Sequence, residues 1–286
     1  SNAKVYSRIM ITFCISTYKN LPYLKLAVQS VREHSYYKDA PFIIHSDESN
    51  DDGTNEWLRE NEDKYNLSPI IVDLKPSGIG PGMNICAEFV ETEYIMFLHS
   101  DFYVTPNWDL ELMKLQEKYN DEKLWVNSFR IEPNMFNDQD RPGTHFVPKE
   151  AFGAYHDDFQ PLLMLEYAKQ IAEKNDFEIP KGEGVSGLVR KSWWDHIGGN
   201  DDQFAPTSWD DYDLFLRMLN EGGKFLMPTK SIVWHFGARG SHRLEENNGK
   251  TSERQSKHER INAQKFYNKW GGMPKKDQYG MICGIQ

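Results

Sequence analysis

The stretch "YIMFLHSDFYV", residues 94–104, is apolar for five residues and then presents His99, Ser100 and Asp101. The length and composition of the apolar run are typical of a buried strand. An ionised carboxylate taken out of water costs several kcal/mol unless it is paired or holds a cation. Asp101 therefore needs a solvent-facing turn or a partner.

The first half of the chain alternates short β-rich runs with longer amphipathic runs. This pattern predicts strand–helix units stacked into a mostly parallel, Rossmann-like α/β sheet flanked by helices. The expected strands are 8–15, 41–44, 69–72 and 94–98. Helices are expected at 21–34, within 51–65, at about 83–91 and from Pro106, with Thr54 as the N-cap of the second helix.

The second half is less regular in its pattern. We expect strands at 124–130, 185–190, 224–227 and 231–234, and helices at 161–174, 209–220 and 252–270. The segment 131–160 is rich in Pro, Asp, Asn and aromatic residues, which predicts an irregular surface insertion.

Composition excludes several classes of protein. The 286 residues contain 33 Lys and Arg against 43 Asp and Glu, and the net charge of −10 disfavours a nucleic-acid partner. No apolar run approaches the roughly 20 residues of a transmembrane helix, so no stable membrane insertion is expected. The three cysteines form no C-x-x-C pair, which argues against a disulfide framework or a structural zinc site. We expect a cytoplasmic protein.

Polar segments follow each of the first four expected strands. They read "STYKN", "HSDESNDDGT", "KPSGIGPGMN" and "HSDF". Ligands of open α/β sheets bind outside the carboxyl ends of the strands. Acidic clusters that face one cleft repel each other unless a divalent cation or a donor-rich ligand lies between them. The sequence therefore predicts a binding site at this edge.

The ordered set of segments resembles the family 2 glycosyltransferases of GT-A fold, which use nucleotide-sugar donors. The similar segments are "ISTYKNLPYLKLAVQSV", "IIHSDESNDDGTNEWL", "GMNICAEFVETEYIMFLHSDF", "WDDYDLFLRMLNEGGK" and "SIVWHFGARGS", within residues 8–242. Two positions depart from the family pattern. His99 stands where the family has the first Asp of its D-x-D metal motif, and Ser16 stands where it has Pro.

The resemblance implies a division of the chain. Residues 4–242 form a single GT-A domain, with a nucleotide-binding half at 4–120 and an acceptor and catalytic half at 121–242. Residues 243–286 are expected to form a C-terminal lid and a helix that packs on the domain. Basic residues of the Gly-rich stretch near 239–243 (Arg239, His242 and Arg243) could bring cations to a diphosphate.

The resemblance also assigns roles to individual residues. Asp101 and His235 are implied to bind Mn²⁺ or Mg²⁺, and His99 to bind the metal or the donor ribose. The nucleoside pocket is implied to contain Thr17, Tyr18, Asp47, Glu48 and Asn84. Asp211 is implied to be the base that takes the acceptor proton in an inverting transfer, with Asp210 as its support.

Each of these residues also has a structural interpretation. Asp101 can belong to a turn, and histidines at strand ends are often simply hydrogen-bonded. The segment that contains Asp47 and Glu48 is also a good turn and helix cap, and Asn84 can cap a helix. Carboxylates at a helix start, such as Asp210 and Asp211, are favoured by the helix dipole.

The leading hypothesis is a metal-dependent glycosyltransferase that moves a sugar from a nucleotide-sugar, with UDP-type donors favoured, to a glycan or other hydroxyl acceptor. The alternative is a non-catalytic sugar-nucleotide or glycan-binding protein with a degenerate metal motif. A nucleotidyltransferase is disfavoured, because "CISTYKN" lacks the glycines of a phosphate loop. A retaining transferase stays open, and the motifs indicate no oligomeric state.

Overall fold

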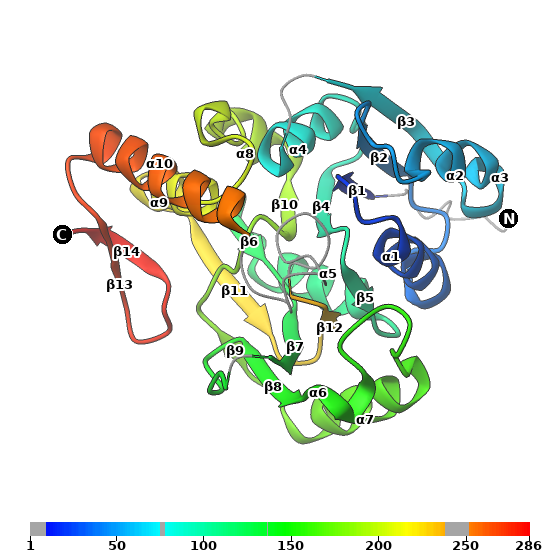
Figure 1. Ribbon diagram of the computed structural model, residues 1–286. Coiled ribbons are helices and arrows are strands. Elements are labelled where there is room, and N and C mark those ends of the chain that lie inside the picture. The colour runs from blue at the N-terminus through cyan, green and yellow to red at the C-terminus, as the bar shows by residue number, and fades with distance from the viewer. Residues whose placement is uncertain (1–9, 75–77, 136, 238–251) are drawn as a thin grey trace, which may run out of the picture.

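A central sheet of eight strands runs through the protein. Figure 1 shows it with helices packed around it. The computed structural model describes residues 10–74, 78–135, 137–237 and 252–286. The strand order is β3 (Leu67–Asp73), β2 (Phe42–Asp47), β1 (Ile11–Thr17), β4 (Tyr94–His99), β10 (Gly187–Arg190), β6 (Leu124–Val126), β11 (Lys224–Pro228), β9 (Glu178–Ile179). The first four strands are parallel, as are β6 and β11, whereas β10 and β9 are antiparallel to their neighbours. The predicted mostly parallel α/β sheet is confirmed, and strands from both sides of residue 120 share it.

Helices cover both faces of the sheet, which explains the nearly continuous apolar strands. All seven residues of β1 are buried. Phe13 and Ile15 belong to the core that includes α1 (Leu21–His34) and α5 (Trp108–Tyr119). Cys14 belongs to the opposite core with α4 (Ile79–Glu88). The alternation of side chains along β1 therefore supplies two cores from one strand.

A second sheet lies beside the central one and was not predicted. Its four strands are β5 (Phe102–Val104), β12 (Ile232–His235), β7 (Phe129–Asn134) and β8 (Thr144–Pro148). The predicted strand 124–130 is wrong in one respect, because it divides into β6 and β7, which belong to different sheets. The irregular insertion predicted for 131–160 is also wrong. It contains most of β7, β8 and α6 (Lys149–Phe152), because Ile131 and Val147 are buried in a third core.

The helix ends match the sequence in some places and not in others. The bounds of α1 and α7 (Pro161–Lys174) agree with the prediction. The second helix divides into α2 (Thr54–Glu60) and α3 (Glu62–Tyr65). Thr54 is not its N-cap, because Gly53 takes that position with φ 84°, and Thr54 Oγ1 donates to Asp52 Oδ1 over 2.6 Å. α4 begins at Ile79, four residues earlier than expected.

The C-terminal elements lie against the start of α9 (Asp210–Asn220). In Figure 1, α10 (Glu253–Trp270) runs beside α9, and the hairpin of β13 (Pro274–Lys276) and β14 (Ile282–Ile285) lies at the edge of the molecule. Phe266 of α10 contacts Trp209, with ring centroids 5.4 Å apart. Two short helices complete the described elements, α8 (Lys191–Ile197) and the 3₁₀ helix η1 (Asp202–Phe204).

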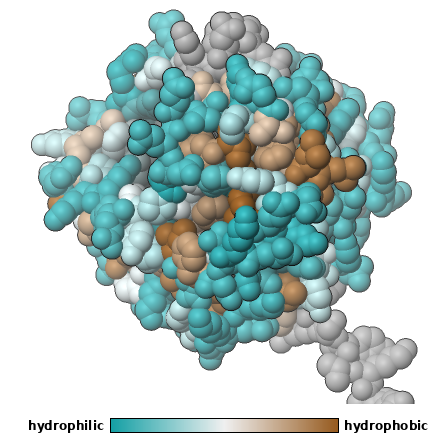
Figure 2. Space-filling view, turned by 90° about the horizontal axis from the view of Figure 1, so that it is seen from below, coloured by the Kyte–Doolittle hydropathy of each residue, from teal (hydrophilic) through white to brown (hydrophobic). Residues whose placement is uncertain are grey.

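The surface is mostly polar where Figure 2 shows it. Hydrophilic residues cover most of this face, and apolar residues gather in patches near its centre. Among the described residues, no helix combines the length and the apolar character that crossing a membrane requires.

We predict that Gly82→Ala destabilises the protein by about 2 kcal/mol, since overpacking a tight site costs that order of free energy. A Cβ at Gly82 would lie 2.0 Å from Ser16 Oγ and 2.5 Å from His45 Nδ1, so α4 could not keep its place on β1 and β2. Urea unfolding measures the effect. Gly80→Ala in the same helix is the matched control, because its nearest contact is 3.2 Å. Equal effects of the two variants would contradict the steric argument.

Candidate active site

A cavity of about 320 Å³ opens at the carboxyl ends of β1, β2 and β4. Side chains from the ends of these strands line it together with the loop that precedes α9 and the first turns of α10. This is the edge of the sheet where the sequence predicted a site. Eight of the ten predicted site residues line the cavity: Thr17, Tyr18, Asp47, His99, Asp101, Asp210, Asp211 and His235.

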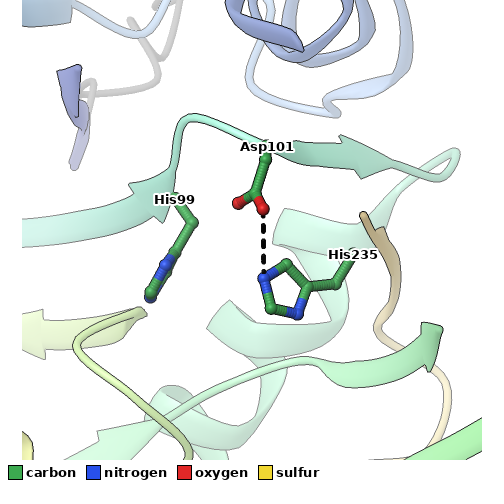
Figure 3. A group of neighbouring side chains, drawn as sticks. All are labelled: His99, Asp101 and His235. Atoms are coloured by element: carbon green, nitrogen blue, oxygen red, sulfur yellow. Dashed lines mark ion pairs between the residues drawn. The ribbon is translucent and has the colours of Figure 1, made fainter. Parts of the chain in front are cut away.

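His99, Asp101 and His235 form a cluster in which one ligand atom of each residue lies within 4.8 Å of the others. Figure 3 shows His99 at the end of β4, Asp101 in the turn after it, and His235 at the end of β12. His235 Nε2 is 3.4 Å from Asp101 Oδ2. Two imidazoles and a carboxylate are donors that can hold a divalent transition-metal ion. The three residues that the sequence proposed for the metal therefore come together.

The pairing of β5 with β12 brings these residues into contact. Phe102 is the antiparallel partner of His235, and Phe236 N donates to Asp101 O over 3.2 Å. The ring of Phe102 stacks on that of His99, with centroids 5.0 Å apart. The turn after β4 is thus fixed by the second sheet, and Asp101 is buried in it.

Glu132 on β7 supports His235 from behind and was not identified from the sequence. Its Oε1 lies 2.8 Å from His235 Nδ1, which leaves Nε2 directed toward Asp101. Carboxylates behind metal-binding histidines orient the ring in this way. Burial alone lowers the pKa of His235, but the charges of Asp101 and Glu132 outweigh it and raise that pKa to about 9. The two carboxylates therefore favour a positive charge at this position, which either a proton on His235 or a metal cation can supply.

Asp210 and Asp211 open α9 on a strained backbone. Ser208 and Trp209, directly before them, have φ values of 76° and 70°. Such left-handed conformations cost about 1–2 kcal/mol each for residues with a side chain, so the surroundings must hold them. The side chain of Asn262 on α10 does so, because its Nδ2 donates to the carbonyls of Phe204, Thr207 and Ser208 at 2.7, 2.8 and 3.0 Å.

The two carboxylates differ from ordinary surface aspartates in their pKa values. Burial, followed by the charge of Asp211, raises the pKa of Asp210 to about 7. Burial also raises the pKa of Asp211, with a contribution from the charge of Glu183 and an opposing one from Lys276. Within the described part of the chain, Asp210 Oδ2 is buried without a hydrogen-bond partner. The pair can therefore accept a proton near neutral pH.

Thr17, Tyr18 and Asp47 lie at the opposite side of the cavity from α9. Thr17 Oγ1 donates to Asn20 Oδ1 over 2.7 Å, and Asp47 Oδ1 accepts from the Ser49 amide and hydroxyl at 2.9 and 2.6 Å. The guanidinium of Arg254 lies 5.7 Å from the centre of the Tyr18 ring. These polar and aromatic groups can bind a nucleoside.

Glu48 and Asn84 lie outside the cavity lining. Glu48 is exposed, and its backbone amide pairs with Asp73 O over 2.9 Å. Asn84 lies within α4, where its side chain donates to Asn200 O and accepts from Asn200 N at 2.9 and 2.8 Å. Asn84 thus fastens α4 to the loop after α8. The residues Arg239, His242 and Arg243 lie outside the described residues.

Sequence reasoning missed several residues of the site. Glu132 lies between Ile131 and Pro133, in a segment that was interpreted as an irregular insertion, and it follows no apolar run of the kind that precedes Asp101. Arg254 and His258 of α10 also line the cavity, and nothing in the sequence of this polar helix indicated that its first turns lie there. Ser16 and His45 line the cavity as well.

Comparisons with known proteins agree with the geometry. Residues 12–178 match the family model described as glycosyl transferase family 2. The structure is similar to that of GalNAc-T7 with UDP, GalNAc and Mn²⁺, with 15% identity and a TM-score of 0.59 over 80% of this chain and 44% of that chain. It is also similar to S. aureus TarS, with 12% identity and a TM-score of 0.53 over 91% of this chain and 40% of that chain.

A further similar structure is S. aureus TarS 1–349 in complex with UDP-GlcNAc, with 13% identity and a TM-score of 0.53 over 91% and 67% of the two chains. These likenesses confirm the predicted GT-A fold. The chain spans less than half the length of GalNAc-T7 and of full TarS. No curated protein was found to match it.

We predict that Asn262→Asp destabilises the protein by about 3 kcal/mol or more, because it places a buried carboxylate against three carbonyl oxygens. The amide that it replaces is 1% exposed. Urea unfolding at pH 7 measures the change. Asn268→Asp is the matched control in the same helix, since Asn268 is exposed and accepts only from Gln264 among the hydrogen bonds found. A loss no larger than that of the control would show that Asn262 does not hold the loop.

Proposed function

Because the chain belongs to glycosyl transferase family 2, whose model matches more than half of it, we propose that it transfers a sugar from a nucleotide-sugar to an acceptor hydroxyl. The observation that carries the proposal is the order of groups in the cavity. The His99–Asp101–His235 cluster at the end of β4 lies between the ends of β1 and β2 and the start of α9. A nucleotide-sugar has the same order, with its diphosphate between nucleoside and sugar.

Asp101, His235 and His99 are the residues that hold a divalent cation in this proposal. A bound Mn²⁺ or Mg²⁺ supplies positive charge for the diphosphate that leaves the sugar. Glu132 keeps His235 oriented toward Asp101 through its hydrogen bond to Nδ1. Mn²⁺ matches two imidazoles and one carboxylate better than Mg²⁺ does, because Mg²⁺ takes oxygen ligands, whereas a first-row transition-metal ion also accepts imidazole nitrogen.

Asp211 is the proposed base, with Asp210 as its support. As the acceptor oxygen bonds to the anomeric carbon, its proton passes to Asp211 and the bond to the diphosphate breaks on the opposite side. Direct displacement of this kind inverts the anomeric centre. The raised pKa values of both carboxylates allow the pair to take a proton near neutral pH and release it afterwards.

Thr17, Tyr18 and Asp47 are proposed to hold the nucleoside, with Glu48 at the rim. UDP-type donors are favoured, and the GalNAc-T7 and TarS structures contain UDP and UDP-GlcNAc. Asn84 contributes through the loop after α8 that it fastens. The acceptor is proposed to be a glycan or another hydroxyl compound that enters beside α9.

A second candidate is a sugar-nucleotide or glycan-binding protein without turnover. The observation that favours it is His99 at the position where the family has a carboxylate. A protein of this kind would bind its ligand in the same cavity but would not transfer the sugar. Consumption of a nucleotide-sugar in the presence of Mn²⁺ decides between them.

We predict that Asp101→Ala weakens Mn²⁺ binding by at least about a hundredfold, because the loss of a residue that only orients a metal ligand already costs about 10–100-fold and Asp101 is a proposed ligand itself. Electron paramagnetic resonance of free Mn²⁺ measures the binding directly, without substrate. Asp140→Ala is the matched control, because Asp140 also pairs with a histidine, His145, at 2.8 Å but lies outside the cavity lining. Mn²⁺ affinity that is the same in both variants would remove the metal site from the proposal.

We predict that Asp211→Asn lowers the rate of sugar transfer by about a hundredfold to ten-thousandfold, the usual contribution of a positioned base. The affinity for the nucleoside diphosphate should stay within about threefold, because Asp211 lies on the acceptor side of the cavity. Radiolabelled transfer measures the rate, and calorimetry measures the affinity.

Asp195→Asn serves as the control for the loss of one carboxylate, since Asp195 is half exposed and pairs only with Lys191 among the described ion pairs. Full activity of Asp211→Asn would remove the assigned base. Donor binding without any turnover in the wild type would favour the binding protein.

A further inference from the structure

Three side chains on neighbouring strands form a hydrogen-bonded chain beside the cavity. Ser16 Oγ on β1 lies 3.1 Å from His45 Nδ1 on β2, and His45 Nε2 lies 2.8 Å from Asp73 Oδ1 on β3. Ser16 and His45 are register partners in the parallel pairing of β1 with β2. On the other side, β2 pairs with β3 so that His45 faces Ile71, and Asp73 lies two positions further along β3 on the same face. We call this chain the Ser16–His45–Asp73 relay.

Packing holds the relay in one arrangement. The side chain of His45 is 3% exposed and that of Asp73 is 33% exposed. Gly82 of α4 covers the first two members so closely that a Cβ there would lie 2.0 Å from Ser16 Oγ. Ser16 and His45 line the cavity, whereas Asp73 is not among its lining residues.

The direction of the hydrogen bonds follows from the chemistry of the three groups. A carboxylate only accepts, so His45 Nε2 carries the proton that is donated to Asp73. In the neutral ring Nδ1 is then a lone-pair acceptor, and the hydroxyl of Ser16 donates to it. The Ser16 oxygen is left with lone pairs for a donor in the cavity.

The relay lies at the nucleoside side of the site. In the sheet order β2, β1, β4 the metal cluster is on the far side of β1 from His45. With the diphosphate at the cluster and the sugar toward Asp211, the nucleoside extends toward Ser16 and Asp47. This step rests on the function proposed above.

We infer that the Ser16–His45–Asp73 relay selects the base of the donor, and that it selects a 2,4-dioxopyrimidine such as uracil. Uracil and thymine carry one ring N–H between two carbonyl groups, and the Ser16 oxygen accepts that N–H. Cytosine presents a lone pair at the same ring nitrogen, which would face the lone pairs of Ser16. A buried polar group without its partner is a strong source of discrimination.

Calorimetric titration of UDP, dTDP, CDP and GDP with Mn²⁺ at pH 8 tests the inference. The wild type should bind UDP at least about tenfold more tightly than CDP, the effect of one mismatched hydrogen bond. Tighter binding of CDP or GDP than of UDP and dTDP would overturn the assignment.

The decisive variant is Asp73→Asn, which changes a residue outside the cavity lining. The amide of Asn can donate to His45 Nε2, so the ring proton moves to Nδ1 and the Ser16 hydroxyl turns its hydrogen toward the base. The UDP-to-CDP affinity ratio should fall by about tenfold. Ser16→Ala removes the acceptor itself and should lower the same ratio. If Ser16→Ala lowers the UDP-to-CDP affinity ratio but Asp73→Asn leaves it unchanged, the relay is overturned.

Asp121→Asn is the matched control. Asp121 also has a side-chain partner at 2.8 Å, and its side chain is 24% exposed, but that partner is Lys224 at the other end of the sheet. The UDP-to-CDP affinity ratio of the Asp121→Asn variant should equal that of the wild type. Wild-type protein that binds none of the nucleotides would overturn the proposed function together with the relay. If the wild type binds UDP but the UDP-to-CDP affinity ratio is unchanged in both Ser16→Ala and Asp73→Asn, only the relay is overturned.

Discussion

The ion-paired contact of His235 with Asp101 and Glu132 joins the two sheets of the protein. Asp101 follows β4 of the central sheet, whereas Glu132 and His235 belong to β7 and β12 of the second sheet. Buried charges of this kind cost free energy unless each has its partner, so removal of one member leaves the others uncompensated. The contact of the three groups fixes the end of β4 and the turn after it against the second sheet, at the mouth of the cavity.

The opposite wall of the cavity depends on a different constraint, backbone strain. Ser208 and Trp209 hold left-handed conformations directly before Asp210, and Asn262 and Gln255 of α10 bind the same loop through its carbonyls and the Ser208 hydroxyl. The C-terminal helix therefore stabilises the position of the two carboxylates although it lies outside the residues that match the family model. The protein itself thus holds the carboxylate pair in its buried, proton-accepting geometry.

The sequence predicted the features that depend on local patterns. The four parallel strands, the polar ends of β1, β2 and β4, and the bounds of α1 and α7 follow from periodicity and turn residues, and the motifs indicated Asp101, His235, Asp210 and Asp211. The second sheet was missed because β5, β7, β8 and β12 are short and pair across large sequence separations, for example Trp234 with Tyr103. No local pattern states that Leu124–Val126 and Phe129–Asn134 belong to different sheets.

The same distinction explains which site residues could be found. Asp101 ends an apolar run, so its burial and its need for a partner can be inferred from its neighbours in sequence. Ser16, His45 and Asp73 are each ordinary residues in their own segments, and only the parallel register of three strands makes them one hydrogen-bonded chain. A substitution at Asp73 thus acts on the cavity through two intervening residues. The roles of such residues depend on strand register and not on their own sequence segment. Substitutions there can change specificity while the sequence motifs stay the same.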